Sequence, residues 1–338
     1  MNRTLGELTA ATFLVVAALF PIVNPLGNTP IFLTLTRGLS GPGRARLARA
    51  IAINGLVLMV VSIFIGTHIL GFFGISLPVV QVAKFLQQYN LHWAEVRNIW
   101  GPYNTSQPMD KIREANRILD EHGIKVSIEG TGFFKIPLPP EGPEGQKILN
   151  KQWELLAASM ERAKAFGTDK IRVFTFMLGR GETKTEKAYG RIWELTNEAA
   201  RRAKGFRLAV ENIGGGYVST GAEAALLFKN VKAENVGLTW DPNNAGESGE
   251  QSFPDGYRKL DPARIFHVHL RDYKHQDGKV VWTRVGDGEF DNLGQIRAML
   301  KDGYKGTFTL ETHWRDPKGK MYSSEQSLKS LLDVVAKV

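Results

Sequence analysis

The chain has 338 residues, a net charge of +9 at neutral pH and no cysteine. This length predicts two structural units, and the lack of cysteine excludes disulfides, thiolate metal sites and a cysteine nucleophile. The lysines and arginines are scattered over amphipathic segments and are not gathered among aromatic residues, so we expect no nucleic-acid partner.

The amino-terminal part of the chain is nearly uncharged. No charged residue occurs in residues 8–36 or in residues 50–83, and each run reaches the roughly 20 residues that cross a bilayer. The first run is too long for a cleaved secretory signal and has no small-x-small cleavage site. We therefore predict an all-α membrane hairpin over residues 1–82, with apolar runs at about 8–36 and 50–80.

A polar cluster, Asn24 to Pro30, interrupts the first apolar run. Its two prolines and two asparagines are unfavourable in a lipid-facing helix, which predicts a broken helix that faces protein or water. The segment FPIVNPLGNTPIFLTLT, Phe20 to Thr36, resembles the start of MarC-type (SnatA-like) multi-pass membrane proteins, and the likeness covers about residues 5–82. The resemblance implies more spanning helices and a second Asn-Pro-x-Gly element in the other half of such proteins. This chain has one such element, Asn24 to Gly27.

The side of the membrane that carries the rest of the chain stays open. Four arginines lie between the two apolar runs and favour a cytoplasmic loop there: Arg37, Arg44, Arg46 and Arg49. If both apolar runs span the membrane, the rest of the chain lies on the outer side. If the first run is re-entrant, the rest of the chain lies on the cytoplasmic side. We expect membrane localisation, with membrane lipid as the partner of the amino-terminal segment.

After residue 83 short apolar strands alternate with amphipathic helices, which is typical of parallel β-α units. We predict that residues 83–338 form a (β/α)8-type TIM barrel of the α/β class that lacks its first strand. The seven predicted strands are Trp93–Asn98, Ile124–Glu129, Lys170–Phe176, Phe206–Glu211, Val236–Trp240, Ile265–Leu270 and Thr307–Glu311. The predicted helices include Val82–Asn90, Met109–His122, Lys147–Phe166, Thr185–Lys204 and Asn292–Lys301.

The missing first strand leaves the junction between the two units unexplained. Only a shortened helix precedes Trp93, and Ile75–Val80 is the alternative first strand. An unclosed barrel has two unpaired strand edges, which promote aggregation. A gene fusion or a misjoined reading frame would produce such a junction.

Four predicted strands end in side chains of the types that bind metal ions in proteins. Catalytic groups of β/α barrels gather at the carboxyl ends of the strands, and the strand-end residues here are Glu211, Asp241, His269 and Glu311. A single one of them is explained by a helix cap or a structural histidine, but their recurrence at one level predicts that three carboxylates and an imidazole converge. Such an oxygen-rich set suits manganese, magnesium, cobalt or zinc.

These strand ends resemble the xylose-isomerase-like TIM-barrel family of sugar phosphate isomerases and epimerases. The likeness covers about residues 85–332 and includes the segments Glu95–Gly101, Ile124–Glu129, Gly167–Val173 and Val285–Glu289. It implies that Glu211, Asp241, His269 and Glu311 bind a divalent metal ion, and that the two glutamates also flank the substrate.

The implied reaction is the isomerisation or epimerisation of a sugar or sugar phosphate through a metal-bound enediolate. The metal ion would hold the carbonyl and a neighbouring hydroxyl and acidify the C–H bond between them. Glu211 and Glu311 are the expected catalytic acid–base pair. Two alternatives stay open: a metal-dependent sugar dehydratase on the same barrel, and a fragment of a MarC-type transporter whose barrel tail is non-catalytic or only binds sugar.

Four further residues are candidates for substrate binding. Arg97 is suited to a phosphate or hydroxyl, and Lys135 with the preceding Phe133 and Phe134 is placed to line the mouth of the barrel. The other two, His267 and Asp272, are expected beside the metal ligands. Surface salt bridges, loop packing and a core histidine explain these residues equally well. The sequence also leaves a homo-oligomer open.

Overall fold

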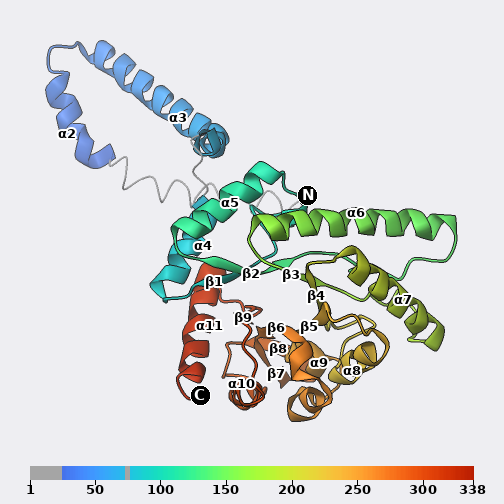
Figure 1. The fold of residues 1–338 in the computed structure, drawn as a ribbon. Coiled ribbons are helices and arrows are strands. Elements are labelled where there is room, and N and C mark those ends of the chain that lie inside the picture. Colours follow the sequence, from blue (N-terminus) through green and yellow to red (C-terminus); the bar gives the residue numbers. More distant parts are fainter. Residues whose placement is uncertain (1–24, 73–76) are drawn as a thin grey trace. The chain divides into compact units, whose positions relative to one another are not determined.

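The computed structural model describes residues 25–72 and 77–338. The chain divides into two compact units, Met1–Ile75 and Ser76–Val338 (Figure 1). The domain boundary expected at residue 82 stays a prediction.

The described part of the first unit consists of helices α2 (Pro25–Leu35) and α3 (Gly41–Phe72). Pro30 lies inside α2, so the described part of the predicted break is helical, and Asn24 lies outside the described residues. Residues 8–24 and 73–76 of the two apolar runs also lie outside them. Among the described residues, none of the helices combines the length and the apolar character needed to cross a membrane.

The second unit is built on a parallel sheet whose seven strands follow one another in chain order, with helices outside them (Figure 1). The strands are β1 (Trp93–Val96), β2 (Lys125–Gly130), β3 (Lys170–Val173), β4 (Arg207–Glu211), β5 (Val236–Trp240), β6 (Ile265–Leu270) and β9 (Phe308–Leu310). All seven predicted strands are confirmed to within three residues at each end. The fold is therefore that of a TIM barrel, as predicted.

Eight helices surround the described part of this sheet. They are α4 (Leu77–Gln88), α5 (Met109–Glu121), α6 (Pro143–Ala165), α7 (Glu186–Arg202), α8 (Gly221–Asn230), α9 (Pro242–Glu247), α10 (Asn292–Lys301) and α11 (Lys320–Val335). The five predicted helices are confirmed, although α4 and α6 begin earlier than expected. In α6, Pro143 occupies the first turn, where the missing N–H of proline costs no helical hydrogen bond.

The hydrophobic core fills the inside of the sheet and the layer between strands and helices. Trp240 is fully buried there, and its indole N–H donates to Gln295 Oε1 at 3.1 Å. A second cluster joins α4 and α5 to the first two strands through Ala83, Ile112 and Val126. Helix α4 therefore covers the sheet beside β1.

No described strand closes the sheet between β1 and β9, and we call this opening the seam. The alternative first strand Ile75–Val80 is wrong as far as it is described, because Leu77–Val80 is helical. Side chains cross the seam: Arg97 Nη1 lies 3.6 Å from Glu311 Oε1. The sequence thus predicted the missing strand correctly for the described residues.

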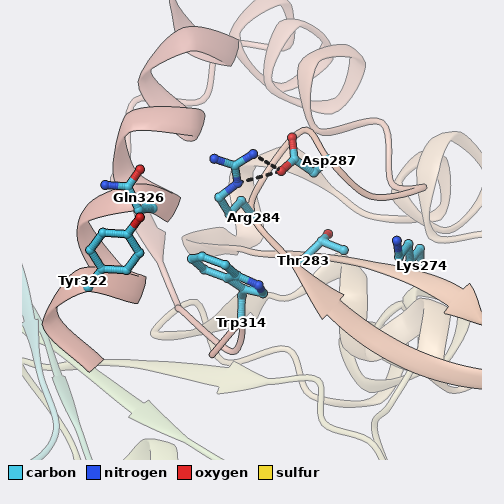
Figure 2. A pocket seen from close by; sticks show the side chains of 7 residues that line it. All are labelled: Lys274, Thr283, Arg284, Asp287, Trp314, Tyr322 and Gln326. Carbon is cyan, nitrogen blue, oxygen red and sulfur yellow. Dashed lines mark hydrogen bonds and ion pairs between the residues drawn. The ribbon is translucent and has the colours of Figure 1, made fainter. Parts of the chain in front are cut away.

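A hairpin that the sequence analysis did not predict follows β6. It pairs β7 (Asp272–Gln276) antiparallel with β8 (Lys279–Thr283). Asp277 and Gly278 form its two-residue turn with φ values of 53° and 71°, which is the Asp-Gly signature of a tight hairpin. The hairpin borders a cavity that α11 closes from the other side (Figure 2).

Candidate metal centre

Glu211, Asp241, His269 and Glu311 meet at the carboxyl ends of β4, β5, β6 and β9, and we call them the strand-end cluster. One ligand atom of each residue lies within 4.8 Å of the others. The parallel strands bring them together, because parallel pairing places the carboxyl ends of neighbouring strands at the same rim. The arrangement has the donor set of a divalent-metal site, with three carboxylates and one imidazole.

The imidazole of His269 faces all three carboxylates. Its Nδ1 lies 3.8 Å from one oxygen each of Glu211, Asp241 and Glu311. This buried nitrogen has no hydrogen-bond partner in the described part of the chain. The other ring nitrogen, Nε2, lies 2.8 Å from Glu95 Oε2. A proton held on Nε2 would leave the lone pair of Nδ1 available to a metal ion.

The cluster also favours a positive charge at this nitrogen. Burial by itself lowers the pKa of His269, but Glu95 and the carboxylates of Asp241 and Glu211 outweigh burial and raise that pKa well above its usual value. Either a proton or a metal cation at Nδ1 would supply this positive charge. The residues therefore fit a divalent ion, which would replace the proton on Nδ1.

Two buried arginines hold the carboxylates in place. Arg172 of β3 forms a close ion pair with Glu211, and Arg271 Nη2 lies 2.7 Å from Asp241 Oδ2. Burial raises the pKa of Asp241, but Arg271 and His269 lower it below its usual value. Asp241 is therefore ionised at neutral pH, as metal binding requires.

Glu311 differs from the other carboxylates in its accessibility. A quarter of its side chain is exposed, against 5% for Glu211. Burial raises the pKa of Glu311, but His313, His269 and Arg271 hold it well below its usual range. Glu311 is thus the ionised carboxylate of the cluster that a ligand from solvent reaches first.

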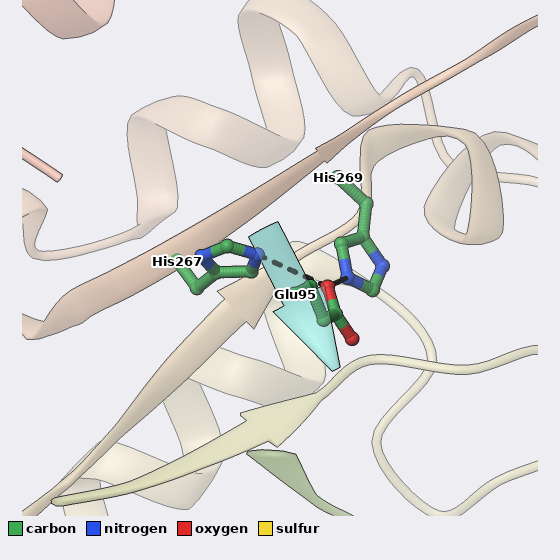
Figure 3. A group of neighbouring side chains, drawn as sticks. All are labelled: Glu95, His267 and His269. Carbon is green, nitrogen blue, oxygen red and sulfur yellow. Dashed lines mark hydrogen bonds and ion pairs between the residues drawn. The ribbon is translucent and has the colours of Figure 1, made fainter. Parts of the chain in front are cut away.

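Glu95 is a functional candidate that the sequence analysis missed as a site residue. Its Oε2 lies 3.2 Å from His267 Nε2 and 2.8 Å from His269 Nε2 (Figure 3). Its Oε1 lies 3.1 Å from Arg172 Nε. Glu95, His267 and His269 have the ligand types of a second metal site. The guanidinium of Arg172 opposes a second cation there, so we interpret Glu95 as the support of His269.

Two of the predicted substrate-binding residues have their polar atoms bonded within the protein. His267 is fully buried, and its ring nitrogens contact Glu95 and the Thr307 hydroxyl. Asp272 is fully buried and accepts hydrogen bonds from the backbone N–H groups of Gly286, Gly288 and Phe290. The protein itself uses the polar atoms of both residues, and their contact with a substrate stays a prediction.

The other two predicted substrate-binding residues lie at the rim. Arg97 has 47% of its side chain exposed and pairs with Glu311. Lys135 Nζ lies 4.7 Å from the centroid of the Phe174 ring, and burial, opposed by Glu211, lowers its pKa below the usual value. Phe133 and Phe134 are buried in the core and do not line the mouth as predicted.

Comparison with protein families assigns the two parts of the chain separately. Residues 83–336 match the family model described as xylose isomerase-like TIM barrel. Residues 9–85 match the model of the MarC family integral membrane proteins. The two matches follow one another in the order that the sequence analysis predicts.

Solved structures with the same barrel include proteins described with bound metal ions or sugar. An IolI protein with a bound zinc atom has a TM-score of 0.63 at 17% identity, and the match covers 78% of this chain and 94% of that protein. D-psicose 3-epimerase with D-tagatose from Clostridium cellulolyticum H10 has a TM-score of 0.60 at 16% identity, with coverages of 76% and 92%. A xylose isomerase-like TIM barrel protein from Mycobacterium smegmatis in complex with magnesium has a TM-score of 0.59 at 18% identity, with coverages of 76% and 88%. At these identities the likeness shows the fold.

Curated relatives match only the amino-terminal part. The UPF0056 membrane protein YvbG of Bacillus subtilis (strain 168) is 38% identical over 66 residues, which are 20% of this chain and 31% of that protein. A UPF0056 membrane protein of Archaeoglobus fulgidus is 32% identical over 65 residues, which are 19% of this chain and 30% of that protein. This chain therefore spans about a third of the length of the curated relatives it matches.

Proposed function

Because this chain belongs to the xylose isomerase-like TIM barrel family through residues 83–336, we propose that it is a divalent-metal-dependent isomerase or epimerase of a sugar or sugar phosphate. The placement of three carboxylates around the unpartnered Nδ1 of His269 carries this proposal. A divalent ion bound by the strand-end cluster would polarise the carbonyl and hydroxyl oxygens of a sugar and acidify the C–H bond between them.

We assign the two glutamates different parts in the proton transfer. Glu311 is partly exposed and removes the proton from the substrate carbon. Glu211 is buried and paired with Arg172, and it orients the substrate. Glu311 returns the proton on its own side, and on the opposite face a water molecule held by Glu211 gives a proton and is then restored by the proton on Glu311. Return to the neighbouring carbon gives isomerisation, and return to the opposite face of the same carbon gives epimerisation.

Arg271, Arg172 and Glu95 act on the ligands and do not contact the reacting carbon in this proposal. Arg271 orients Asp241, and Arg172 orients Glu211. Glu95 keeps the His269 ring turned so that Nδ1 faces the carboxylates. These contacts fix the distances between the ligands before a substrate arrives.

We also propose that the amino-terminal part attaches the barrel to a membrane. The 38% identity to a membrane protein over 66 residues supports this. The alternative of a transporter fragment has less support, because the chain spans only about a third of those relatives.

A sugar dehydratase is the alternative enzyme. It begins with the same removal of a proton from the sugar, and its dehydrated product distinguishes it from an isomerase or epimerase.

The first test is metal binding by the full-length protein purified in detergent. After treatment with EDTA, we expect manganese, magnesium, cobalt or zinc to raise the unfolding temperature, since a ligand at a hundredfold excess over its Kd stabilises by about 2.7 kcal/mol. The rise should be absent in His269→Ala and retained in His275→Ala, whose ring lies on the exposed hairpin. A wild type that responds to none of the four metals would exclude the metal centre.

The second test is turnover of ketoses, aldoses and their phosphates by the metal-loaded protein. We expect Glu311→Gln, assayed at a metal concentration that saturates the variant, to lose at least a hundredfold in rate, since a positioned general base contributes about 10²–10⁴-fold. Metal binding without turnover of any sugar would contradict the proposed isomerase activity and leave the proposed metal site intact. A dehydrated product would favour the lyase.

A further inference from the structure

A cavity of 320 Å³ lies between the β7–β8 hairpin and α11 (Figure 2). Its lining includes Lys274, Thr283, Arg284, Trp314, Tyr322 and Gln326, and none of the residues of the strand-end cluster. We propose that this cavity is a regulatory site for a phosphate-type oxyanion, separate from the strand-end cluster. The binding of the anion is argued from the cavity alone, and its regulatory effect rests on the proposed function through the metal site.

The polar groups on the cavity wall are mostly uncommitted donors. The buried hydroxyl of Thr283 has no hydrogen-bond partner within the described residues. In the same part of the chain, Lys274 Nζ forms no ion pair, and the Tyr322 hydroxyl and the side-chain amide of Gln326 make no hydrogen bond. Figure 2 shows Thr283 and Lys274 on one side of the cavity and Tyr322 and Gln326 on the other. A ligand with several acceptor oxygens would satisfy these donors.

The charge of the cavity favours an anion. Arg284 Nε and Nη2 contact one oxygen of Asp287 at 2.7 and 2.6 Å, which fixes the guanidinium and leaves Nη1 for a ligand. Lys274 is the second cation of the lining, and Lys318 Nζ adds a third beside it, 4.7 Å from the centroid of the Tyr322 ring. The cations outnumber the one carboxylate of the lining, and phosphate forms its strongest hydrogen bonds with such cationic donors.

Asp272 is a buried carboxylate on the same face of the hairpin, where it pairs with Thr283. It accepts hydrogen bonds from three backbone N–H groups of the loop 286–290 and does not line the cavity. These N–H dipoles offset its charge, so the residues of the lining determine the sign of the potential in the cavity.

The β7–β8 hairpin connects the cavity to the surroundings of the metal centre. Lys274 and Thr283 lie on one of its faces and Trp282 lies on the other, because successive residues of a strand alternate. Arg271 Cζ lies 4.5 Å from the centroid of the Trp282 ring, and Arg271 in turn contacts Asp241 at 2.7 Å. A ligand that fixes Thr283 in the cavity thus also restricts the tryptophan that packs on this arginine.

The segment after β9 makes a second connection. Trp314 lines the cavity, and the preceding residue, His313, has its Nε2 3.5 Å from Glu311 Oε2. An oxyanion that holds Thr283 and Trp314 therefore orders the residues that contact Arg271 and Glu311 before a metal ion arrives. This ordering and the opposite charges of the two ligands both favour tighter metal binding when the anion is present.

Calorimetric titration of the EDTA-treated full-length protein with inorganic phosphate, at fixed ionic strength, tests the cavity directly. We expect Lys274→Met to weaken binding by about tenfold or more, because hydrogen bonds between charged groups are the strong ones. Thr283→Val should weaken binding severalfold and yet unfold at no lower temperature than the wild type, because it removes a buried hydroxyl without a partner among the described residues. The matched control is Lys279→Met, an exposed lysine on the same hairpin outside the cavity.

A titration with phenyl phosphate identifies the form of the anion. Tighter binding than that of inorganic phosphate would assign the cavity to a phosphate ester whose organic part packs on Trp314 and Tyr322. Equal or weaker binding would assign it to free phosphate. In both cases Lys274→Met should bind the anion less tightly than the wild type.

The regulatory effect is tested by repeating the phosphate titration with the metal-loaded protein, after subtraction of a titration of the metal ion alone. Coupling between two sites is reciprocal, so we expect phosphate to bind at least about fivefold tighter to the metal-loaded protein than to the EDTA-treated protein. Trp282→Leu should bind phosphate like the wild type without metal and should lose this difference, since Trp282 contacts Arg271 and does not line the cavity.

Three results would overturn the inference or its premise. Equal phosphate binding by Lys274→Met and the wild type would show that the cavity is not an anion site. Binding of equal strength with and without metal would reject the regulatory effect, and so would a metal-dependent gain that persists in Lys274→Met, since phosphate would then bind the metal ion itself. Failure to bind any metal ion would contradict the proposed function, while the titration of the EDTA-treated protein would still show whether the cavity binds the anion.

Discussion

Glu95 contacts the strand-end cluster from β1, the strand at the edge of the sheet. Its carboxylate joins His267, His269 and Arg172, which come from two other strands. Burial raises the pKa of Glu95, but His269, His267 and Arg172 hold it well below its usual range. A carboxylate that stays ionised is a strong acceptor for the Nε2–H group of His269.

We expect Glu95→Gln to weaken metal binding by about 10–100-fold, because an amide is a weaker acceptor and orients the imidazole poorly. Competition with a chromophoric chelator measures the affinity without relying on activity. Glu289→Gln, which alters the exposed pair with His275, is the matched control and should bind metal like the wild type. An unchanged affinity in Glu95→Gln would mean that the histidine is oriented by its other contacts alone.

Glu129 makes the stability of the fold depend on pH. Burial raises its pKa from 4.5 to about 8. The folded protein therefore holds this proton more tightly than the unfolded chain does. The resulting stabilisation is complete below pH about 4.5 and is lost as the pH rises to about 8.

As the pH rises from about 5 to about 8.5, we expect the free energy of unfolding to fall less in Glu129→Gln than in the wild type. Urea unfolding at several pH values in this window measures the difference. Glu121→Gln on the exposed side of α5 is the control and should follow the wild type. Parallel curves for Glu129→Gln and the wild type would show that Glu129 is already ionised in the folded protein.

At the scale of the elements, Asp272 ties the start of the hairpin to the loop that follows it. A Cβ atom on Gly288 would lie 2.1 Å from Asp272 Oδ1, so this loop has no room for a side chain. We expect Gly288→Ala to destabilise the barrel by about 1–3 kcal/mol, since it displaces a buried carboxylate from its hydrogen bonds.

The control for this substitution is Gly190→Ala in α7, where an added Cβ meets no atom within 4 Å. Alanine is favoured over glycine in a helix by about 0.8–1.0 kcal/mol, so this variant should be more stable than the wild type. Thermal unfolding of both variants gives the comparison. A Gly288→Ala protein as stable as the wild type would show that the loop adjusts without cost.

The sequence predicted the strands of the barrel well, and the four polar side chains that it placed at the strand ends lie together in the fold. Parallel strands are buried on both faces and appear as short apolar runs, and a polar residue at the end of such a run is easy to recognise. The role of Glu95 could not be predicted, because it depends on His267 and Arg172, which β6 and β3 bring to it in the fold.

The hairpin and the two phenylalanines were missed for different reasons. The turn at Asp277 and Gly278 is a recognisable signal, but the strand before it, Asp272–Gln276, carries polar residues at most positions and lacks an apolar run. Phe133 and Phe134 follow a strand, which suggested a place at the mouth. They stack on each other at 3.9 Å and pack inward, because large aromatic rings gain most when fully buried.

At the scale of the whole molecule, the seam leaves β1 and β9 each with one edge that no described strand pairs with. Trp93 at the start of β1 is 50% exposed. We expect association that increases with protein concentration and that is reduced in Trp93→Lys, because a charge on an edge strand opposes edge-to-edge pairing. Sedimentation velocity in detergent measures this.

Ile148→Lys is the matched control, since it places the same charge at a 40% exposed apolar residue on the surface of α6. It should associate like the wild type. If both variants associate equally, the contact between chains lies elsewhere than at the edge of β1.

The seam also determines how a bound ion would leave. Strands at the border of a sheet fray more readily than those in its middle, and Glu311 follows one border strand while Glu95 belongs to the other. Release of the ion is therefore expected to proceed through brief fraying of β1 or β9, without unfolding of the remaining strands. An ion held by His269 and Glu311 would slow amide hydrogen exchange in both border strands together, although they lie at opposite ends of the sheet's pairing order.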